Sequence, residues 1–201
     1  GNVTPGDAPG FPVTLSRPGS YELAGNLAVS AGSTGIQITA NDVTIDLNGF
    51  RIAGSGTANI GIDGAKNGST IRNGTIARFK SHGIYLTGRH QVVEDMRVVE
   101  NGGHGIRAGG DANIRSSTAA KNGLGGVVCY AGCLVERSTA ANNGGNGISC
   151  GLSCQVEGNV ASFNGADGIN LFDSGFALGN TVSRNVGYGI SGGGTPVYES
   201  N

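Results

Sequence analysis

A glycine followed by an aliphatic residue recurs along this chain at an almost constant interval, and this repeat restricts the fold more than any other feature. The dipeptides are Gly61-Ile62, Gly83-Ile84, Gly105-Ile106, Gly126-Val127, Gly147-Ile148, Gly168-Ile169 and Gly189-Ile190. Successive glycines are separated by 22, 22, 21, 21, 21 and 21 residues. Such a unit, with β-branched residues at alternate positions, favours three short strands joined by tight turns, which is one coil of a β-solenoid.

An asparagine precedes each of the last five repeat glycines by four residues. These asparagines are Asn101, Asn122, Asn143, Asn164 and Asn185. In a solenoid they stack one above another, so each amide can hydrogen-bond to the next. Asparagine also tolerates a left-handed turn conformation, and a glycine follows four of the five. We therefore expect an asparagine ladder at one corner of the solenoid, with the asparagines adopting the turn conformation.

Apolar residues occupy fixed places in each unit, as an interior column requires. The residue after the repeat glycine is always aliphatic. Three residues after the glycine stand Leu86, Ala108, Cys129, Cys150 and Leu171, and nine after it stand Ile114, Val135 and Val156. Because alternate residues of a strand face the same side, all these positions should point into the core.

The two ends of the chain depart from the repeat. Residues 1–34 are expected to form N-terminal capping strands, and residues 35–201 one continuous parallel β-helix. Beyond Gly189 no amphipathic helix covers the last coil, so we expect exposed strand edges there.

Composition excludes two classes of partner. The chain has 201 residues, a net charge of −1 and no basic run, which argues against binding nucleic acid. No apolar stretch approaches the roughly 20 residues needed to span a bilayer, so membrane insertion is not expected. We expect a secreted protein, extracellular or at the cell surface, whose sequence here begins after any signal peptide.

The stretch from Val43 to Phe79, with the Asn…Gly-Ile units after it, resembles the right-handed parallel β-helix proteins of the pectin-lyase-like superfamily, as found in bacteria. The resemblance covers roughly residues 10–195. It implies an all-β fold, a right-handed single-stranded parallel β-helix (β-solenoid) with about eight coils of 21–22 residues. It implies no single function, because the superfamily includes lyases, hydrolases, epimerases and adhesins.

The four cysteines lie at equivalent places in two neighbouring units, and they should form one patch. They are Cys129, Cys133, Cys150 and Cys154. Disulfides, free core thiols and a four-thiolate zinc site are the three alternatives. An extracellular chain favours disulfides, and the C-x3-C spacing is wider than that of a usual zinc knuckle. Pairing within a coil is preferred, as Cys129–Cys133 and Cys150–Cys154, although stacked cysteines of neighbouring coils also lie within bonding range.

One cluster on the outward face offers candidate chemistry. Its members are Asp63, His82, Tyr85, His104 and Arg107. A uronate lyase or epimerase needs a base, an acid and a cation, roles that His104 or Tyr85 and Arg107 could fill. Gly103-His104-Gly105 also resembles the Gly-His-Gly motif of polygalacturonases, but that family's paired aspartates are missing. The Asp-Pro-His-Asp motif of alginate epimerases is missing as well. A mixed polar surface without catalysis is the alternative interpretation.

A second outward column carries charges of both signs. It contains Glu94, Arg115, Glu136 and Glu157, flanked by Asp95 and Arg137. Charges of opposite sign on successive coils indicate a ladder of ion pairs, which is favoured over a calcium site between Glu136 and Glu157.

The uniform coils favour a non-catalytic function. Six intervals that differ by at most one residue leave no long loop to wall a cleft, and the chain has no tryptophan to stack on sugars. We therefore expect a non-catalytic extracellular solenoid, structural or adhesive, that associates end to end into fibres. The alternative is a protein that binds or modifies acidic polysaccharides, as a lyase or epimerase, through the Asp63–Arg107 face. A third interpretation is a fragment of a longer protein. No cofactor or metal is expected.

Overall fold

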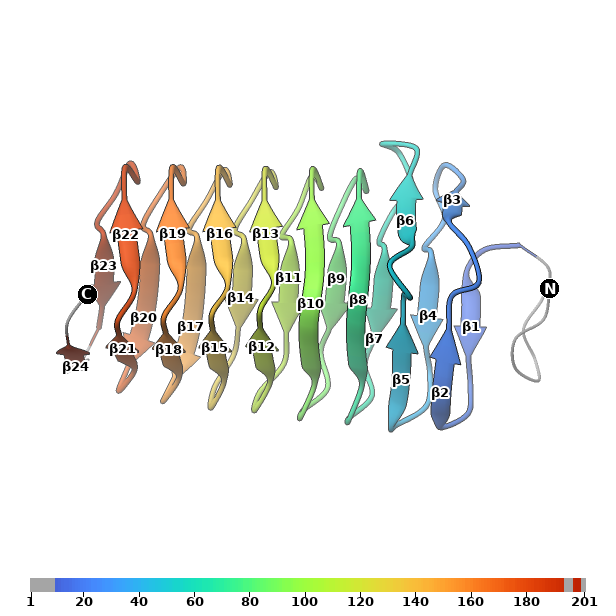
Figure 1. Cartoon of the computed structure of the whole chain (residues 1–201), viewed down its shortest axis with the longest axis horizontal. Coiled ribbons are helices and arrows are strands. Elements are labelled where there is room, and N and C mark those ends of the chain that lie inside the picture. Colours follow the sequence, from blue (N-terminus) through green and yellow to red (C-terminus); the bar gives the residue numbers. More distant parts are fainter. Residues whose placement is uncertain (1–9, 194–196, 200–201) are drawn as a thin grey trace.

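The computed structural model describes residues 10–193 and the backbone of Val197–Glu199, and within them the chain forms a solenoid of about nine turns (Figure 1). Every strand pair is parallel. The described residues contain no helix, so none of them forms a helical membrane span. The expected all-β parallel solenoid is confirmed.

Two sheets run along the whole stack. The first, here called sheet A, is built from β1 (Val13–Leu15), β4 (Ile36–Ile38), β7 (Ile62–Gly64), β9 (Ile84–Leu86), β11 (Ile106–Ala108), β14 (Val127–Cys129), β17 (Ile148–Leu152), β20 (Ile169–Asp173) and β23 (Ile190–Gly192). In this sheet every described coil contributes one strand, and from β4 onward that strand begins directly after a glycine. The outward residues of sheet A are therefore stacked at strand spacing, about 4.8 Å apart.

The second sheet, sheet B, has two columns of strands. One column contains β2 (Gly19–Glu22), β5 (Val43–Asp46), β12 (Asn113–Arg115), β15 (Leu134–Glu136), β18 (Gln155–Glu157), β21 (Phe176–Leu178) and β24 (Val197–Glu199). The other contains β3 (Leu27–Val29), β6 (Arg51–Gly54), β13 (Thr118–Ala120), β16 (Thr139–Ala141), β19 (Val160–Ser162) and β22 (Thr181–Ser183). The strands β8 (Thr70–Ala77) and β10 (Val92–Val99) are longer and span both columns.

Coils are numbered here from β1, so that coil 4 holds β9 and β10, coil 5 holds β11–β13, coil 6 holds β14–β16 and coil 7 holds β17–β19. Residues 13–29 form the first coil, because β1, β2 and β3 pair in register with β4, β5 and β6. The residues before Gly10 lie outside the described part of the chain.

The interior is made of the predicted aliphatic columns. Ile62, Ile84, Ile106, Ile148 and Ile169 are fully buried, as are Ile114, Val135 and Val156. Burying one such side chain stabilises a fold by about 1.5–3 kcal/mol. Repeating that burial in every coil is enough to explain why strands of only three residues are stable here.

The predicted asparagine ladder is present and buried. In each step the Oδ1 of one asparagine accepts from the backbone N–H and from the Nδ2 of the asparagine one coil earlier. The Nδ2 also donates to a backbone carbonyl further back, as Asn143 does to Ala119 at 3.0 Å. The asparagine side chains therefore supply hydrogen-bond partners to backbone N–H and C=O groups at a corner where no strand pairing does.

The prediction that the asparagines themselves adopt the left-handed conformation was wrong, because the residue before each asparagine adopts it instead. The left-handed residues are those just before them, Glu100, Lys121, Asn142, Phe163 and Arg184, with φ between 54° and 58°. The asparagine itself must turn its side chain inward to reach the next coil. The glycine after it is required for space, because a Cβ on Gly123 would lie 2.3 Å from the carbonyl oxygen of Gly102.

A second buried ladder was not predicted. Ser117, Ser138, Asn159 and Asn180 stand at the corner between the two columns of sheet B, at intervals of 21 residues. Asn159 Oδ1 accepts from the backbone N–H of Ser138, and Asn180 Oδ1 accepts from that of Asn159. The constant interval was visible in the sequence, but the mixture of serine and asparagine concealed it.

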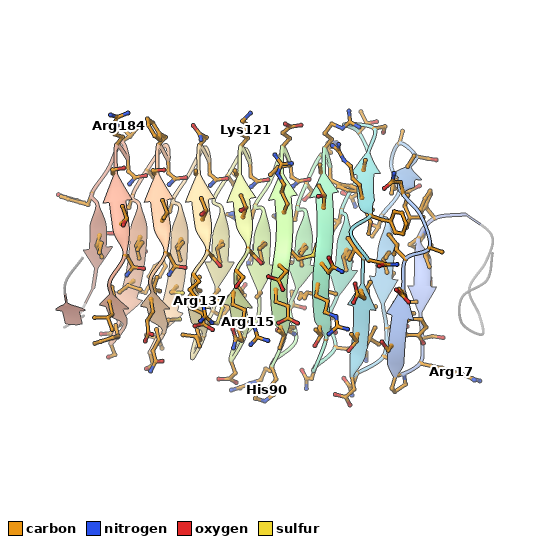
Figure 2. The ribbon with its side chains drawn as sticks, viewed as in Figure 1. Arg17, His90, Arg115, Lys121, Arg137 and Arg184 are labelled. Atoms are coloured by element: carbon orange, nitrogen blue, oxygen red, sulfur yellow. A yellow bond between two sulfur atoms is a disulfide. The ribbon has the colours of Figure 1, made fainter. Side chains whose placement is uncertain are left out.

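The predicted charge column lies on the outer surface of sheet B (Figure 2). Glu94, Arg115, Glu136 and Glu157 occupy paired positions in successive coils. Arg115 Nε donates to Glu94 Oε2 at 2.8 Å, whereas Glu136 pairs with Arg137 beside it at 2.9 Å. These ion pairs are partly or largely exposed, so each contributes less than about 1 kcal/mol.

Candidate functional site

The outward residues of sheet A bring the predicted cluster together. Asp63, Tyr85 and Arg107 are direct partners in the register of β7, β9 and β11. The imidazole rings of His82 and His104 stack with centroids 5.3 Å apart and planes 10° from parallel. His82 also stacks on Tyr85, at 5.1 Å. The five residues therefore form one continuous surface over coils 3 to 5.

Arg107 is held between two tyrosine rings. Its guanidinium carbon lies 5.4 Å from the ring centroid of Tyr85 and 5.5 Å from that of Tyr130, and Nη2 donates to the Tyr130 hydroxyl at 2.5 Å. Such cation–π contacts fix the direction of a flexible side chain. Tyr130 was missed in the sequence because it lies at the turn after β14, two residues beyond the outward position of that strand.

The acceptor nitrogens of both histidines are occupied by the backbone. His82 Nδ1 accepts the N–H of His104 at 3.0 Å, and His104 Nδ1 accepts the N–H of Gly125 at 2.9 Å. An Nδ1 that accepts a hydrogen bond carries no proton, so the neutral ring bears its proton on Nε2. Burial, followed by the charges of His104 and Arg107, lowers the pKa of His82 to about 4. Burial and the charge of Arg107 also lower the pKa of His104.

The same position carries other acceptors further along the stack. Asn146 Oδ1 accepts the N–H of Asp167 at 2.9 Å, and Asp167 Oδ1 accepts that of Tyr188 at 2.8 Å. The histidines therefore belong to a third ladder, in the position just before the repeat glycine. The proposed role of His104 as a base is in conflict with this geometry, because its only unprotonated nitrogen is used to join coils.

Asp63 lies at one end of the surface. Its side chain is partly buried, and this desolvation raises the pKa of its carboxyl group. The other end of sheet A is closed by its own hydrogen bonds, since Ser191 Oγ donates to Asp167 Oδ2 at 2.6 Å and Asn170 donates to Ser191 at 2.7 Å.

An apolar hollow adjoins Arg107 on the side of the turns. Its volume is about 430 Å³, and its lining includes Val128, Tyr130, Leu152 and Phe172. Tyr130, Leu152 and Phe172 are 50%, 54% and 63% exposed, one from each of three successive coils. Three large apolar side chains exposed in a row form a patch that a ligand or partner would cover.

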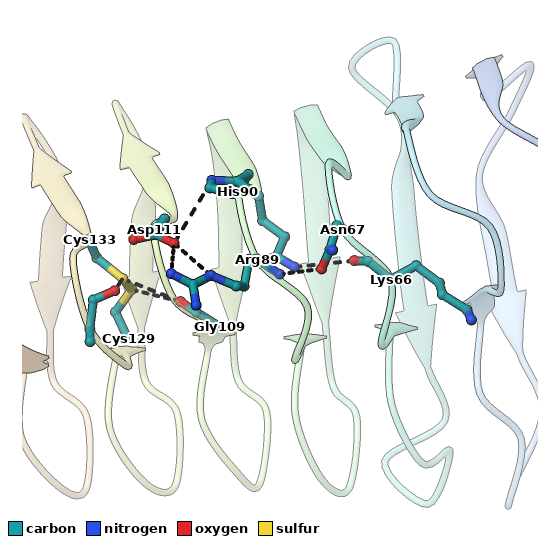
Figure 3. Close-up of polar contacts among 10 residues, drawn as sticks. Lys66, Asn67, Arg89, His90, Gly109, Asp111, Cys129 and Cys133 are labelled. Atoms are coloured by element: carbon teal, nitrogen blue, oxygen red, sulfur yellow. Dashed lines mark hydrogen bonds and ion pairs between the residues drawn. A yellow bond between two sulfur atoms is a disulfide. The ribbon is translucent and has the colours of Figure 1, made fainter.

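The cysteines lie behind this hollow. Cys129 and Cys133 form a disulfide with a Cα–Cα distance of 6.5 Å, which confirms pairing within a coil. Figure 3 shows this bond beside the carbonyl of Gly109 in the preceding coil, close to the ion pair of Arg89 and Asp111. The second expected disulfide is not formed. Cys150 and Cys154 are instead free, buried thiols that lie in hydrogen-bonding contact with each other. The described residues contain no group of three or more metal-ligating side chains.

Comparison with solved structures shows the fold again in proteins of low sequence identity. The periplasmic alginate epimerase AlgG superposes with a TM-score of 0.61 at 13% identity, over 86% of this chain and 49% of that one. The Dettilon tailspike protein superposes with a TM-score of 0.50 at 16% identity, over 94% of this chain and 51% of that one. The chain thus spans about half the length of these structures.

Comparison with curated protein sequences finds no match. The family model of the right-handed beta helix region matches residues 18–153 and 58–201, which together cover most of the chain. The stacked parallel strands of the structure agree with this description. The chain therefore belongs to the right-handed beta helix family.

Proposed function

We propose that this chain binds an acidic polysaccharide along the outer face of sheet A and does not cleave it. The observation that carries the proposal is the clamped guanidinium of Arg107, set between two tyrosine rings and next to an apolar hollow. One structural neighbour is an alginate epimerase, and alginate is an acidic polysaccharide, which supports this class of ligand.

Each part of the surface suits one part of such a ligand. A guanidinium binds a carboxylate through two parallel hydrogen bonds. The Nε2–H groups of His82 and His104 are donors suited to ring hydroxyls and ring oxygens. The rings of Tyr130 and Phe172 are exposed and suit the apolar faces of sugar rings.

The non-catalytic part of the proposal is supported by the protonation of the histidines. A lyase or epimerase must remove the proton at C5 of a uronate with a base that has a free electron pair. In both histidines the Nδ1 pair is used by a backbone N–H and Nε2 carries the proton. Asp63 is a carboxylate on the same face, but Tyr85 stands between it and Arg107, so the two do not converge on one sugar carbon.

Binding is tested by titrating alginate and polygalacturonate into the protein in a calorimeter, with dextran as a neutral polysaccharide. We expect binding to the acidic polymers only, weakening as salt is raised. Arg107→Ala should weaken binding by about tenfold or more, the loss of one charge-assisted hydrogen-bond pair. Arg184→Ala is the matched control, because Arg184 lies over the ring of Phe163 at a different corner of the solenoid. No binding by the unaltered protein, or equal losses in both variants, contradicts the proposal.

Cleavage and epimerisation need their own assay. The protein is incubated with each uronate polymer in deuterated water, and unsaturated products and deuterium at C5 are followed by NMR. We expect neither. Turnover that disappears in Asp63→Asn would overturn the non-catalytic part of the proposal and leave the binding part standing.

Two further parts of the proposal concern location and assembly. The disulfide Cys129–Cys133 supports a place outside the cytoplasm, where a secreted or surface solenoid would serve an adhesive or structural role. End-to-end association is supported by an apolar hollow of about 280 Å³ at the coil 1 end, lined by Leu15, Leu23 and Ile45 among others.

A further inference from the structure

Coils 6 and 7 repeat the same cysteine geometry. Cys129 and Cys150 are direct partners in the register of β14 and β17. Leu134 and Gln155, which follow the second cysteine of each coil, are partners in β15 and β18. In both coils the residue before the second cysteine is left-handed, Gly132 at φ 69° and Ser153 at φ 54°. The backbone of coil 7 therefore carries Cys150 and Cys154 at the same positions, and next to the same left-handed residue, as the disulfide-bonded pair of coil 6.

The two thiols of coil 7 are not equivalent. The thiol of Cys150 and the backbone amides of Cys133, Gly151 and Gly132 lower the pKa of Cys154, whose Sγ also lies 3.5 Å from the carbonyl oxygen of Tyr130. The hydrogen bond from Cys150 is the largest of the influences that lower the pKa of Cys154, and the same bond, with burial, raises the pKa of Cys150. Cys154 is therefore the thiol that loses its proton more readily, and Cys150 is the thiol that keeps its proton.

We propose that Cys150 and Cys154 are a redox-active dithiol, which an external disulfide such as oxidised glutathione converts into a second disulfide within coil 7. The thiolate of Cys154 attacks one sulfur of oxidised glutathione, giving a mixed disulfide and one glutathione thiolate. Cys150 then gives up its proton and attacks the Cys154 sulfur, which releases the second glutathione. The two protein thiols lose two protons and two electrons in total, and both are recovered in two molecules of reduced glutathione.

Access to the pair is through the short turn that joins β17 to β18. Cys154 is only 1% exposed, whereas Leu152 at the end of β17 and Ser153 in the turn are exposed. Opening of the turn, rather than of the coils on either side, is enough to uncover the sulfur. Oxidation of the folded protein should therefore be slower than that of an exposed dithiol, and it should not require unfolding.

The pairing is measured on the folded protein, equilibrated in buffers of reduced or oxidised glutathione and then denatured and alkylated. In reducing buffer we expect alkylation of Cys150 and Cys154, and in oxidising buffer we expect neither to react. Trypsin cleaves after Lys121, Arg137 and Arg184, which puts the cysteines of coil 6 and those of coil 7 on separate peptides. Two disulfides within coils leave these peptides unlinked, whereas any bond between coils joins them.

Two double variants complete the experiment. Cys129→Ala with Cys133→Ala leaves only the coil 7 pair, which should still close in oxidising buffer. Cys150→Ala with Cys154→Ala removes the dithiol, and its thermal midpoint should then be the same in both buffers. In the unaltered protein the closed form should melt about 4–8 °C higher, since even a short closed loop restricts the unfolded chain. Two thiols that still alkylate after oxidation, or peptides joined between coils, would overturn the proposal.

Discussion

Asn143 occupies the middle of the asparagine ladder, and its replacement by alanine tests whether the ladder holds the coils together. The side chain is 2% exposed and takes part in four hydrogen bonds. Its Oδ1 accepts from the N–H and the Nδ2 of Asn122, at 3.1 and 3.0 Å. Its Nδ2 donates to the carbonyl of Ala119 and to Asn164 Oδ1, both at 3.0 Å.

The magnitude follows from the groups that alanine would leave without these partners. Asn122 Nδ2 keeps a second acceptor in Val98, and Asn164 Oδ1 keeps the N–H of residue 143. The backbone N–H of Asn122 and the carbonyl of Ala119 lose the asparagine. A buried polar group without a partner costs about 1–3 kcal/mol, so Asn143→Ala should lower the free energy of unfolding by about 2–6 kcal/mol.

Urea unfolding followed by circular dichroism at 218 nm, roughly the β-sheet band, measures this loss. Asn142→Asp is the matched control, because Asn142 is exposed, lies outside the ladder and has a left-handed conformation that aspartate tolerates. Asn185→Ala at the partly exposed end of the ladder should cost less than Asn143→Ala. If Asn143→Ala costs less than about 1 kcal/mol, or no more than the control, the ladder is not what stabilises this corner.

Three other outcomes are expected. Ser116→Gly should raise the free energy of unfolding by about 1 kcal/mol, because Ser116 has φ 49° at a position where coils 7 and 8 carry Gly158 and Gly179. Gly158→Ala should lower the free energy of unfolding by a similar amount, although its Cβ would meet no other atom. Urea midpoints that shift in the same direction in both variants would contradict this reasoning. The folded pKa of His82 lies below its unfolded value, so the unfolded chain binds more protons between about pH 6.5 and 4 and stability should fall by about 1–3 kcal/mol across that range. His82→Asn keeps a hydrogen-bond acceptor at this position, as Asn146 does, and it should reduce the dependence of stability on pH. An unchanged pH dependence would show that groups other than His82 cause it. Light scattering across a concentration series should show growing mass if solenoids associate end to end, and a constant mass near 20.0 kDa would remove that part of the proposal.

The inward columns and the asparagine ladder were predictable because each depends only on position within the repeat. Ile62, Ile84 and Ile106 must face the core if glycine sets the phase, whatever the details of the turns. The left-handed residues were not predictable by the same means. Asparagine tolerates the left-handed conformation best, but its side chain must point into the solenoid to form the ladder. The left-handed conformation is therefore adopted by Glu100, Lys121 and their equivalents.

The role of the two histidines could not be predicted from the sequence. His82 and His104 lie where a substrate face was expected, and imidazole is the commonest general base. Their function depends on which nitrogen meets the backbone of the next coil, and sequence spacing does not reveal this. One signal was present, since Asn146 and Asp167 stand in the same position of later coils and share with histidine only the ability to accept a hydrogen bond.

The proposed polysaccharide would lie along the solenoid axis. Asp63, Tyr85 and Arg107 belong to successive coils, and the hollow beside Arg107 continues through coils 6 to 8. Neighbouring coils are about 4.8 Å apart, so the step from Asp63 to Val128 spans about 14 Å along the axis. A ligand that crossed the stack at right angles would meet the outward residue of a single strand. A chain that binds both Arg107 and the exposed ring of Phe172 must therefore run parallel to the solenoid axis, and longer oligosaccharides should bind more tightly than a single uronate until that length is filled.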